Sequence, residues 1–445
     1  MINCFIPFLS LPQARQTVRA LGLCDRIKNI YLLATEKIPD EVEGCEMLMI
    51  DSPASTATFR TIALHADTAY TLLYTKYTAF EPGQFAFERL LAIAGDTNAG
   101  MLYADRYLLK NGNSQQAPVI DYQKGSLRDD FDFGSLLFFR SSVLKQAVRA
   151  MDADYRFAGL YDLRLRVSEL AELVHVNEYL YSEVETDIRK SGEKLFDYVD
   201  PKNRAVQIEM EAVCTAYLKR VGGYLAPDFE PVTFDAGGFE QEASVIIPVR
   251  NRIRTIEDAI RSVLAQKTTF RFNLIIVDNH STDGTSEAIG KYTADGRVVH
   301  LVPERSDLGI GGCWNVGVHH PACGKFAVQL DSDDVYSGPD TLQKIVDAFY
   351  EQNCAMVVGT YRMTDFKMNE IPPGIIDHRE WTLENGRNNA LRINGLGAPR
   401  AFYTPVLRRI NLPNTSYGED YALGLRISRT WRIGRIYDVL YLCRR

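Results

Sequence analysis

The stretch ASVIIPVRNRIRTIEDAIRSVLAQKTTFRFNLIIVDNH, residues 243–280, decides the fold of the C-terminal half. It begins and ends with apolar runs rich in β-branched residues, and between them Ile256, Ile260, Val263 and Leu264 fall on one helical face. This pattern predicts a buried strand, an amphipathic helix and a second buried strand. Such alternation is typical of an α/β protein with a mostly parallel sheet that is covered by helices on both faces.

The residues that follow continue the alternation and place acidic side chains at strand ends. RVVHLVPE (297–304) predicts a third strand, IGGCWNVGVHH (310–320) a glycine-rich helix and KFAVQLDSDD (325–334) a fourth strand. Asp278 ends the second strand, and Asp331 ends the fourth. In open α/β sheets ligands bind beyond the carboxyl ends of the strands. We therefore expect both polar clusters at one edge of the sheet.

The N-terminal half repeats this order of segments. INCFIPF (2–8) corresponds to ASVIIPV (243–249), and GLYDLRLRVSE (159–169) corresponds to GEDYALGLRIS (418–428). Five further pairs of segments match in the same order. Self-similarity of this kind predicts a tandem duplication.

The two copies differ at the positions where chemistry would take place. The first copy has YTKYT (74–78) where the second has its cluster of aspartates, and Leu160 stands opposite Asp420. The first copy thus keeps the scaffold pattern without these carboxylates. We expect its remaining acids, Asp105 and Asp162, to be structural or solvated rather than catalytic.

Composition and charge argue against several classes of protein. The net charge of −7 is opposite to the basic face of a nucleic-acid-binding protein. Eight scattered cysteines, with no C-x-x-C pair, indicate reduced thiols rather than disulfides or zinc. The N-terminus lacks the basic region of a signal peptide, and no run reaches the roughly 18 apolar residues of a membrane span. We expect a cytoplasmic protein that can associate with a membrane only peripherally.

The acidic cluster LDSDD contains Asp331, Asp333 and Asp334 within four residues. Carboxylates this close repel one another unless a cation shares the site. Oxygen ligands at a strand end suit a hard divalent cation such as Mn²⁺ or Mg²⁺. The start of a following helix would explain one or two acids, but not an aspartate that is still in the strand. The cluster therefore predicts a metal site.

An ordered set of motifs resembles a known family. SVIIPVRNR, SVLAQ, LIIVDNHSTDGT, WNVG, LDSDD and GEDYALGLR occur in this order, as in the inverting family 2 glycosyltransferases of the GT-A fold. The resemblance covers residues 242–445 and is weak over 1–185, where the internal repeat carries it. It implies two tandem GT-A-like domains: a degenerate domain at 1–185, a helical connector and linker at 186–240, and a catalytic domain at 241–445. The first copy would serve as scaffold, acceptor platform or dimer surface.

The resemblance also implies a donor site. In this family a D-x-D cluster ties a divalent metal to the diphosphate of a nucleotide-sugar, so Asp333 and Asp334 would hold Mn²⁺ or Mg²⁺. The residues expected to contact the donor are Pro248, Val249, Arg250, Asp278, Asn279, Asp331 and Asp333. Asn279 and His280 depart from the commoner DDGS pattern, which puts a preference for uridine in doubt.

The same match assigns the general base to Asp420. It would deprotonate an acceptor hydroxyl that attacks the anomeric carbon opposite the phosphate, which gives inversion without a covalent intermediate. Glu419 would orient Asp420 or bind acceptor, although a helix N-terminal pair is the alternative explanation for both acids. Arg400 and Trp381 are candidates for acceptor contacts, with ordinary packing as their alternative.

The function expected from these residues is metal-dependent, inverting transfer from a nucleotide-diphosphate sugar to a hydroxyl of a glycan or lipid-linked glycan. The likeness to the family suggests bacterial surface polysaccharide synthesis, and a homodimer is compatible with the sequence. Two alternatives remain open: a non-catalytic nucleotide- or glycan-binding module, and a sugar nucleotidyltransferase. The latter class carries a glycine-rich loop after its first strand, whereas PVRNRIRT (248–255) contains no glycine.

Overall fold

The computed structural model describes residues 1–37, 40–110, 112–184, 203–235 and 237–445, which form two compact units. The first unit contains the residues before 185 together with Arg204–Gly223, and the second is Tyr224–Arg445. Residues 186–202 of the predicted connector lie outside the described residues. Helix α6 (Arg204–Arg220) is part of the first unit, and its Glu209 carboxylate accepts hydrogen bonds from the backbone amides of Phe157 and Ala158.

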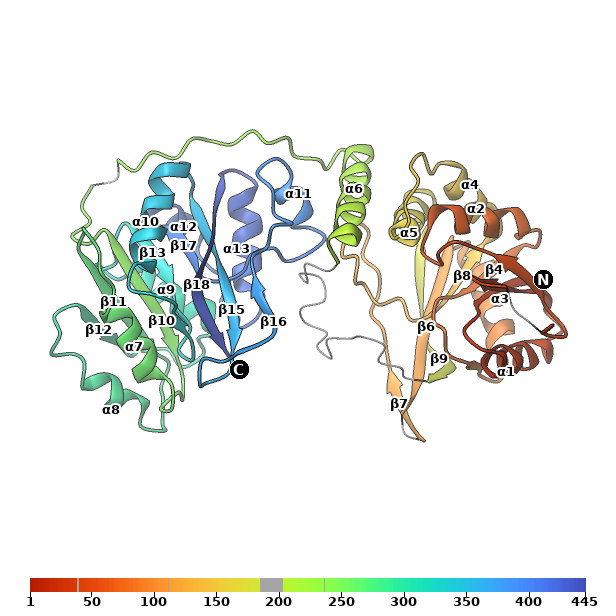
Figure 1. Ribbon diagram of the computed structural model, residues 1–445, viewed down its shortest axis with the longest axis horizontal. Coiled ribbons are helices and arrows are strands. Elements are labelled where there is room, and N and C mark those ends of the chain that lie inside the picture. Colours follow the sequence, from red (N-terminus) through yellow and green to blue (C-terminus); the bar gives the residue numbers. More distant parts are fainter. Residues whose placement is uncertain (38–39, 111, 185–202, 236) are drawn as a thin grey trace. The chain divides into compact units, whose positions relative to one another are not determined.

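The described part of the second unit is built on a mixed sheet of nine strands in the order β12-β11-β10-β13-β17-β15-β18-β14, with β16 paired to β15 (Figure 1). The strands are β10 (Ala243–Val249), β11 (Phe272–Asp278), β12 (Val298–Leu301), β13 (Phe326–Gln329), β14 (Val335–Tyr336), β15 (Met356–Thr364), β16 (Glu370–Ile376), β17 (Arg400–Tyr403) and β18 (Ile433–Arg444). The helices are α7 (Ile256–Leu264), α8 (Thr285–Gly290), α9 (Ile310–His319), α10 (Thr341–Gln352), α11 (Gly386–Asn389), α12 (Thr404–Ile410) and α13 (Glu419–Ser428).

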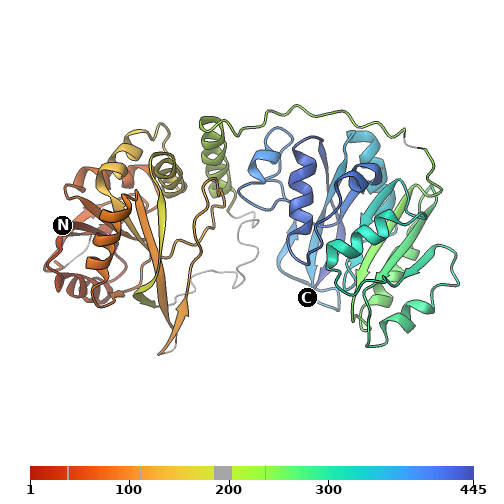
Figure 2. The ribbon, with the colours of Figure 1, turned by 180° about the vertical axis from the view of Figure 1, so that it is seen from behind.

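Strands β12, β11, β10 and β13 are parallel, as the apolar runs predicted. Strand β17 runs antiparallel between β13 and β15, and β15 is parallel to β18. Helix α9 packs on β10 and β11, α7 on β11 and β14, and α10 on β15 and β18 (Figure 2 gives the reverse view). The α/β fold class is therefore confirmed, and the apolar strands fill the core because helices cover them.

The register brings the strand ends to one edge. Val249 pairs with Asp278, so β10 and β11 end level, and Ile246 pairs with Gln329 at the end of β13. Asp331 leaves the sheet two residues later, beside these ends. The edge predicted for ligand binding therefore exists in the second unit.

The first unit has the same strand order, β3-β2-β1-β4-β8-β6-β9-β5, with β7 paired to β6. Its strands are β1 (Ile2–Pro7), β2 (Ile27–Ala34), β3 (Glu46–Met49), β4 (Tyr70–Tyr74), β5 (Phe80–Pro82), β6 (Met101–Lys110), β7 (Asn113–Ala117), β8 (Leu136–Arg140) and β9 (Leu173–Val184). The helices preceding α6 are α1 (Leu11–Gly22), α2 (Thr56–His65), α3 (Ala86–Thr97), α4 (Ser141–Arg149) and α5 (Gly159–Leu170). This shared order agrees with a duplication, while the degenerate character of the first copy remains a prediction.

Ion pairs occupy the first unit where the second has its acidic cluster. Lys76, just after β4, lies 2.5 Å from the carboxylate of Glu183, which is fully buried and also 2.9 Å from Arg106 Nε. Of the two acids expected to be structural, Asp105 accepts a hydrogen bond from the amide of Val119, and Asp162 forms a buried ion pair with a neighbouring arginine. The first unit thus supplies its own cations at this position.

We expect Glu183→Ala to lower the free energy of unfolding of the first unit by about 3–5 kcal/mol, because it takes the buried partner from Arg106. The matched control is Glu178→Ala on the same strand, which removes an exposed pair with Arg89 and should cost no more than about 1 kcal/mol. All three tryptophans lie in the second unit. Denaturant unfolding followed by circular dichroism reports on both units, whereas tryptophan fluorescence reports on the second unit alone. Comparing the two signals gives the loss of stability of the first unit in each variant. Equal losses for the two variants would contradict the prediction.

Candidate active site

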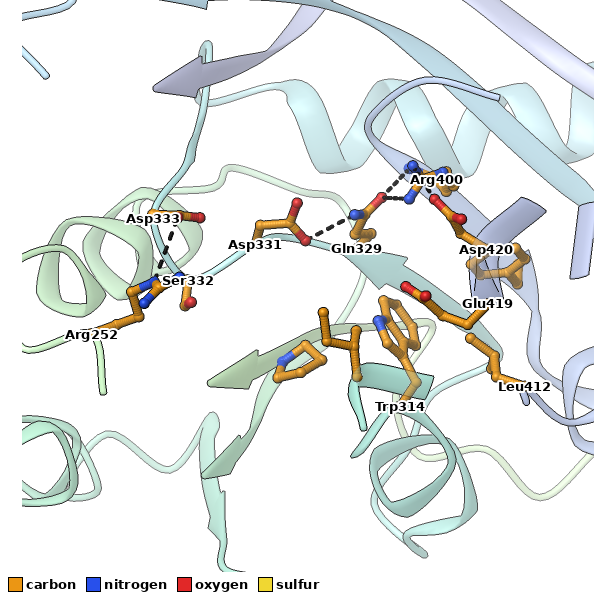
Figure 3. Close-up of a pocket in the computed structure, with 13 residues that line it drawn as sticks. Arg252, Trp314, Gln329, Asp331, Ser332, Asp333, Arg400, Leu412, Glu419 and Asp420 are labelled. Atoms are coloured by element: carbon orange, nitrogen blue, oxygen red, sulfur yellow. Dashed lines mark hydrogen bonds and ion pairs between the residues drawn. The ribbon is translucent and has the colours of Figure 1, made fainter. Parts of the chain in front are cut away.

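A cavity of about 300 Å³ opens at the carboxyl edge of the second unit's sheet (Figure 3). Its walls come from β10, β13 and β17, from α9 and α13, and from the loops that follow β10, β13 and α12. The lining residues are Pro248, Arg252, Ile310, Trp314, Gln329, Asp331, Ser332, Asp333, Arg400, Phe402, Leu412, Glu419 and Asp420. Four carboxylates and two guanidinium groups therefore face one another around a space large enough for part of a small ligand.

One end of the cavity carries two aspartates. The Asp331 carboxylate accepts a hydrogen bond of 2.9 Å from Gln329 Nε2, and its backbone amide donates to the Tyr441 hydroxyl. Burial raises the pKa of Asp331, which the hydrogen bond from Gln329 and the nearby positive charge of Arg400 oppose. Asp333 is partly exposed, with its carboxylate 3.5 Å from Arg252 Nε. These oxygens are of the kind that a hard divalent cation prefers.

Asp334 is turned away from the cavity. It is 4% exposed, and its Oδ1 accepts a hydrogen bond of 2.8 Å from the amide of Arg444 on β18. Burial and the charge of Asp331 raise its pKa to about 7. The structure therefore brings Asp333, but not Asp334, to the cavity, because the chain turns back toward β18 after Asp333.

The three aspartates do not converge on one point. Within the described ranges, the one group of three or more potential ligands with atoms within 4.8 Å of one another is Cys24, Asp25 and Glu88, in the first unit. Asp331 and Asp333 can still supply two carboxylates to a cation and leave its other positions to a ligand. That arrangement fits Mg²⁺ or Mn²⁺, which bind through one or two carboxylates together with phosphate oxygens.

The other end of the cavity carries the two acids that begin α13. Asp420 Oδ2 lies 2.6 Å from Arg400 Nη2, and Oδ1 accepts a hydrogen bond from the amide of Tyr421. Glu419 Oε2 is buried without a hydrogen-bond partner among the described residues, and burial raises the pKa of this side chain. Glu419 and Asp420 thus share the cavity with Asp331 and Asp333, although the two pairs are far apart in sequence.

The residues expected at the donor nucleotide divide into two groups. Pro248 lines the cavity, whereas Val249 is buried in the core and Arg250 is exposed and does not line it. Asp278 is fully buried. Burial alone would raise its pKa, but hydrogen bonds from the Ser281 amide and the hydroxyl of a second serine hold it below its usual range.

Asn279 also points elsewhere. Its Nδ2 donates to the carbonyl of Leu308, and its Oδ1 is buried without a partner in the described chain. Trp381, a candidate for acceptor contact, is buried against Gly386 and does not line the cavity. Arg252 takes the position expected of Arg250. The sequence alone does not single out Arg252, because VRNRIR (249–254) places three arginines in one loop.

The glycine-rich start of α9 packs against the loop that precedes α13. A Cβ built on Gly311 would lie 1.9 Å from the carbonyl oxygen of Pro413, so only glycine allows this approach. Asn414 Oδ1 accepts a hydrogen bond of 2.8 Å from the amide of Gly309, and Asn315 exchanges two hydrogen bonds with the backbone of Leu412. The N-terminal half of α9 thus positions α13.

We expect Gly311→Ala to lower turnover by about 10- to 100-fold, because a displacement of about 1 Å at a reacting group has effects of this size. The control is Gly290→Ala at the end of α8, where a Cβ meets nothing within 4 Å. Initial rates of the two variants, measured at equal amounts of folded protein, provide the comparison. A Gly311→Ala variant as active as Gly290→Ala would show that this approach is not needed.

In the described ranges, no helix combines the length and the apolar character needed to cross a bilayer.

Comparison with known proteins finds a family similarity within the second unit. Residues 244–409 match the model of glycosyl transferase family 2. This segment of the second unit is therefore similar to family 2 glycosyltransferases. The matched segment includes Asp331, Asp333 and Arg400 and ends before Asp420.

Among curated proteins, a glycosyltransferase of uncharacterized activity from Rickettsia felis is 30% identical over 200 residues, which are 44% of this chain and 32% of that protein. TuaG of Bacillus subtilis, a glycosyltransferase provisionally assigned to teichuronic acid biosynthesis, is 33% identical over 120 residues, 27% of this chain and 46% of its own length. The chain thus spans less than half of either relative.

Two solved structures are also similar to parts of the chain. The crystal structure of S. aureus TarS 1-349 covers 46% of this chain and 60% of its own, at 23% identity and a TM-score of 0.38. A mannosyltransferase from Pyrobaculum calidifontis, solved with GDP-Man and Mn²⁺, covers 56% and 68% at 19% identity and a TM-score of 0.36.

Proposed function

We propose that the second unit is a metal-dependent, inverting glycosyltransferase that moves a sugar from a nucleotide-diphosphate sugar to a hydroxyl acceptor. One observation carries this proposal: Asp331 and Asp333 share a single cavity with Asp420, within a unit that is similar to family 2 glycosyltransferases over residues 244–409. The cavity separates the two groups by a space that a sugar ring can occupy. A cation site and a base on opposite sides of one sugar are what this reaction needs.

The donor diphosphate would bind at the end of the cavity that carries Asp331 and Asp333. Asp333, partly exposed and weakly paired with Arg252, is the most accessible ligand for Mn²⁺ or Mg²⁺, with Asp331 beside it. A bound cation would stabilise the negative charge that develops on the leaving diphosphate. Arg252 would then be free to contact a phosphate oxygen directly.

The acceptor would bind at the end that carries Asp420. Its hydroxyl oxygen attacks the anomeric carbon, the carbon–oxygen bond to the phosphate breaks, and the electron pair leaves with the diphosphate. Asp420 accepts the hydroxyl proton, because its carboxylate faces the cavity and has lone pairs beyond those used by Arg400 and the Tyr421 amide. Attack opposite the leaving group inverts the anomeric configuration.

The first unit has no counterpart of this site among the residues described here, because Lys76 and Arg106 surround Glu183 where the second unit has its acids. We propose that it is a scaffold, an acceptor platform or a dimer surface. Bacterial surface polysaccharide synthesis is the proposed context, and the partial similarity to TuaG supports it.

A panel of nucleoside diphosphates and nucleotide-sugars tests this function. With Mn²⁺ present, a ligand at 100 times its dissociation constant should stabilise the protein by about 2.7 kcal/mol, which a thermal-shift assay detects. Release of nucleoside diphosphate from the same UDP- and GDP-sugars, with mono- and oligosaccharides added as hydroxyl acceptors, then tests for turnover. Binding without release would favour a non-catalytic binding module, whereas formation of pyrophosphate from a nucleoside triphosphate and a sugar phosphate would favour a nucleotidyltransferase.

A further inference from the structure

A chain of hydrogen bonds joins the two ends of the cavity. Gln329 Nε2 donates to Asp331 Oδ1 at 2.9 Å, while Gln329 Oε1 accepts from Arg400 Nη1 at 3.1 Å and from the Arg400 amide at 3.2 Å. Arg400 Nη2 in turn lies 2.6 Å from Asp420 Oδ2 (Figure 3). Two side chains therefore connect an aspartate of the donor end to the proposed base.

The fold fixes both members of this link. Gln329 ends β13 and Arg400 begins β17, and these antiparallel neighbours hold the two residues side by side through the pairing of Val328 with Ala401. Arg400 Nε also donates to the carbonyl of Leu396 at 3.1 Å. The guanidinium is thus held on three sides, and its planar fork leaves little freedom in the direction that it presents to Asp420.

Gln329 is a polar side chain at the end of an otherwise apolar, buried strand. It is 6% exposed, and burial of an amide is costly unless its hydrogen bonds are made. Here the oxygen faces Arg400 and the nitrogen faces Asp331, so one orientation of the amide satisfies both neighbours. The opposite orientation would direct a donor at a guanidinium and an acceptor at a carboxylate.

We propose that Arg400 is a positioning residue that sets the orientation of Asp420, and that Gln329 ties this orientation to Asp331 at the donor end. The inference rests on the proposed function of the second unit. Among the described residues Asp420 has one other hydrogen bond, from the adjacent Tyr421 amide, so within that part of the chain Arg400 joins it to the rest of the cavity wall. Substitution of Gln329 should therefore alter both donor binding and the rate of transfer, whereas substitution of Arg400 should alter the rate of transfer through Asp420.

The first test compares Arg400→Gln and Arg400→Lys with the control Arg408→Gln. Arg408 lies outside the cavity and donates to the backbone carbonyls of Val318 and His320. The assay is release of nucleoside diphosphate from a panel of UDP- and GDP-sugars with Mn²⁺ and with added mono- and oligosaccharides as hydroxyl acceptors, together with calorimetry of UDP and GDP binding. Arg400→Gln lowers kcat by about 10- to 100-fold with nucleotide affinity within about threefold of wild type. Arg400→Lys recovers part of this loss, because lysine keeps the charge but not the fork.

The second test separates the two ends of the link at Gln329. Gln329→Leu removes both hydrogen bonds, so it lowers kcat and also raises the KM for the donor. Gln329→Glu keeps an acceptor for Arg400 but places a negative charge beside Asp331, so it raises the donor KM with a smaller change in kcat. A purely structural role would lower the fraction of active protein and leave kcat and KM of that fraction unchanged for both variants.

The outcomes distinguish this inference from the proposed function. If the wild-type protein transfers sugar and Arg400→Gln has the same kcat, the positioning role is wrong and the proposed function stands. A loss confined to the acceptor KM would also overturn it, since Arg400 would then bind acceptor. A wild-type protein that binds UDP or GDP with Mn²⁺ yet releases no diphosphate from any sugar of the panel would refute the proposed function and this inference with it.

Discussion

Asp420→Asn lowers the rate of sugar transfer by about 10²- to 10⁴-fold, the usual contribution of a positioned general base. The amide cannot accept the acceptor's proton, although it is close to the carboxylate in shape and can still accept a hydrogen bond from Arg400, whose Nη2 lies 2.6 Å from Asp420 Oδ2. The diphosphate end of the cavity is left intact. Initial rates at saturating donor measure the loss, and calorimetry with UDP or GDP and Mn²⁺ should give an affinity within a few-fold of wild type.

A suitable control is Asp438→Asn, which changes an exposed aspartate of the same unit that pairs with Lys344. Its rate should equal that of wild type. If Asp420→Asn retains near-wild-type turnover, Asp420 is not the base, and Glu419 becomes the next carboxylate to test because it lines the same cavity. Loss of nucleotide binding in Asp420→Asn would instead show that the two ends of the cavity do not act separately.

Asp333→Ala abolishes metal-dependent nucleotide binding and, with it, transfer. Even residues that only support metal ligands lower metal affinity about 10- to 100-fold when they are changed, so removal of a ligand should exceed that range. The physical reason is that the diphosphate and the aspartates repel one another unless a cation lies between them. Chelation of wild-type protein with EDTA should have the same effect, and added Mn²⁺ or Mg²⁺ should restore activity to wild type but not to Asp333→Ala.

Two further variants make this test specific. Asp307→Ala changes an exposed aspartate paired with Arg305 and should leave binding unchanged. Asp334→Asn should retain metal-dependent binding, because the amide oxygen can still accept the hydrogen bond from the Arg444 amide that Asp334 Oδ1 now accepts. If Asp334→Asn loses the metal and Asp333→Ala keeps it, the sequence-based assignment to Asp334 is right. Full activity of the wild type in chelator would contradict any metal requirement.

The architecture of the second unit was predictable because its strands are apolar on both faces. Runs such as 243–249 and 272–278 form strands inside the sheet rather than at its edges, where both faces are covered, and the helix between them shows one apolar face. The carboxyl ends of parallel strands share one edge of a sheet, which is why Asp278 and Asp331 could be expected there from the sequence alone. Strand β17, which runs antiparallel to both of its neighbours β13 and β15, carries no such signal, since it is only four residues long.

The direction of individual side chains could not be predicted in the same way. Asp333 and Asp334 are adjacent in sequence, yet one faces the cavity and the other is buried against Arg444, because β18 passes behind the loop. Asn279 turns to the carbonyl of Leu308, a contact that depends on a loop about thirty residues further on. Gln329 could have been noticed, because a polar residue in an apolar strand requires partners.

Diffraction from crystals grown with Mn²⁺ and UDP or GDP would show whether Asp331 and Asp333 hold a cation, because manganese is located by its anomalous signal. We expect one manganese ion held by Asp333 and Asp331 together with the nucleotide diphosphate, and Asp420 at the other end of the same cavity. Manganese at another group of ligands, such as Cys24, Asp25 and Glu88 in the first unit, with no nucleotide beside Asp333, would contradict this expectation.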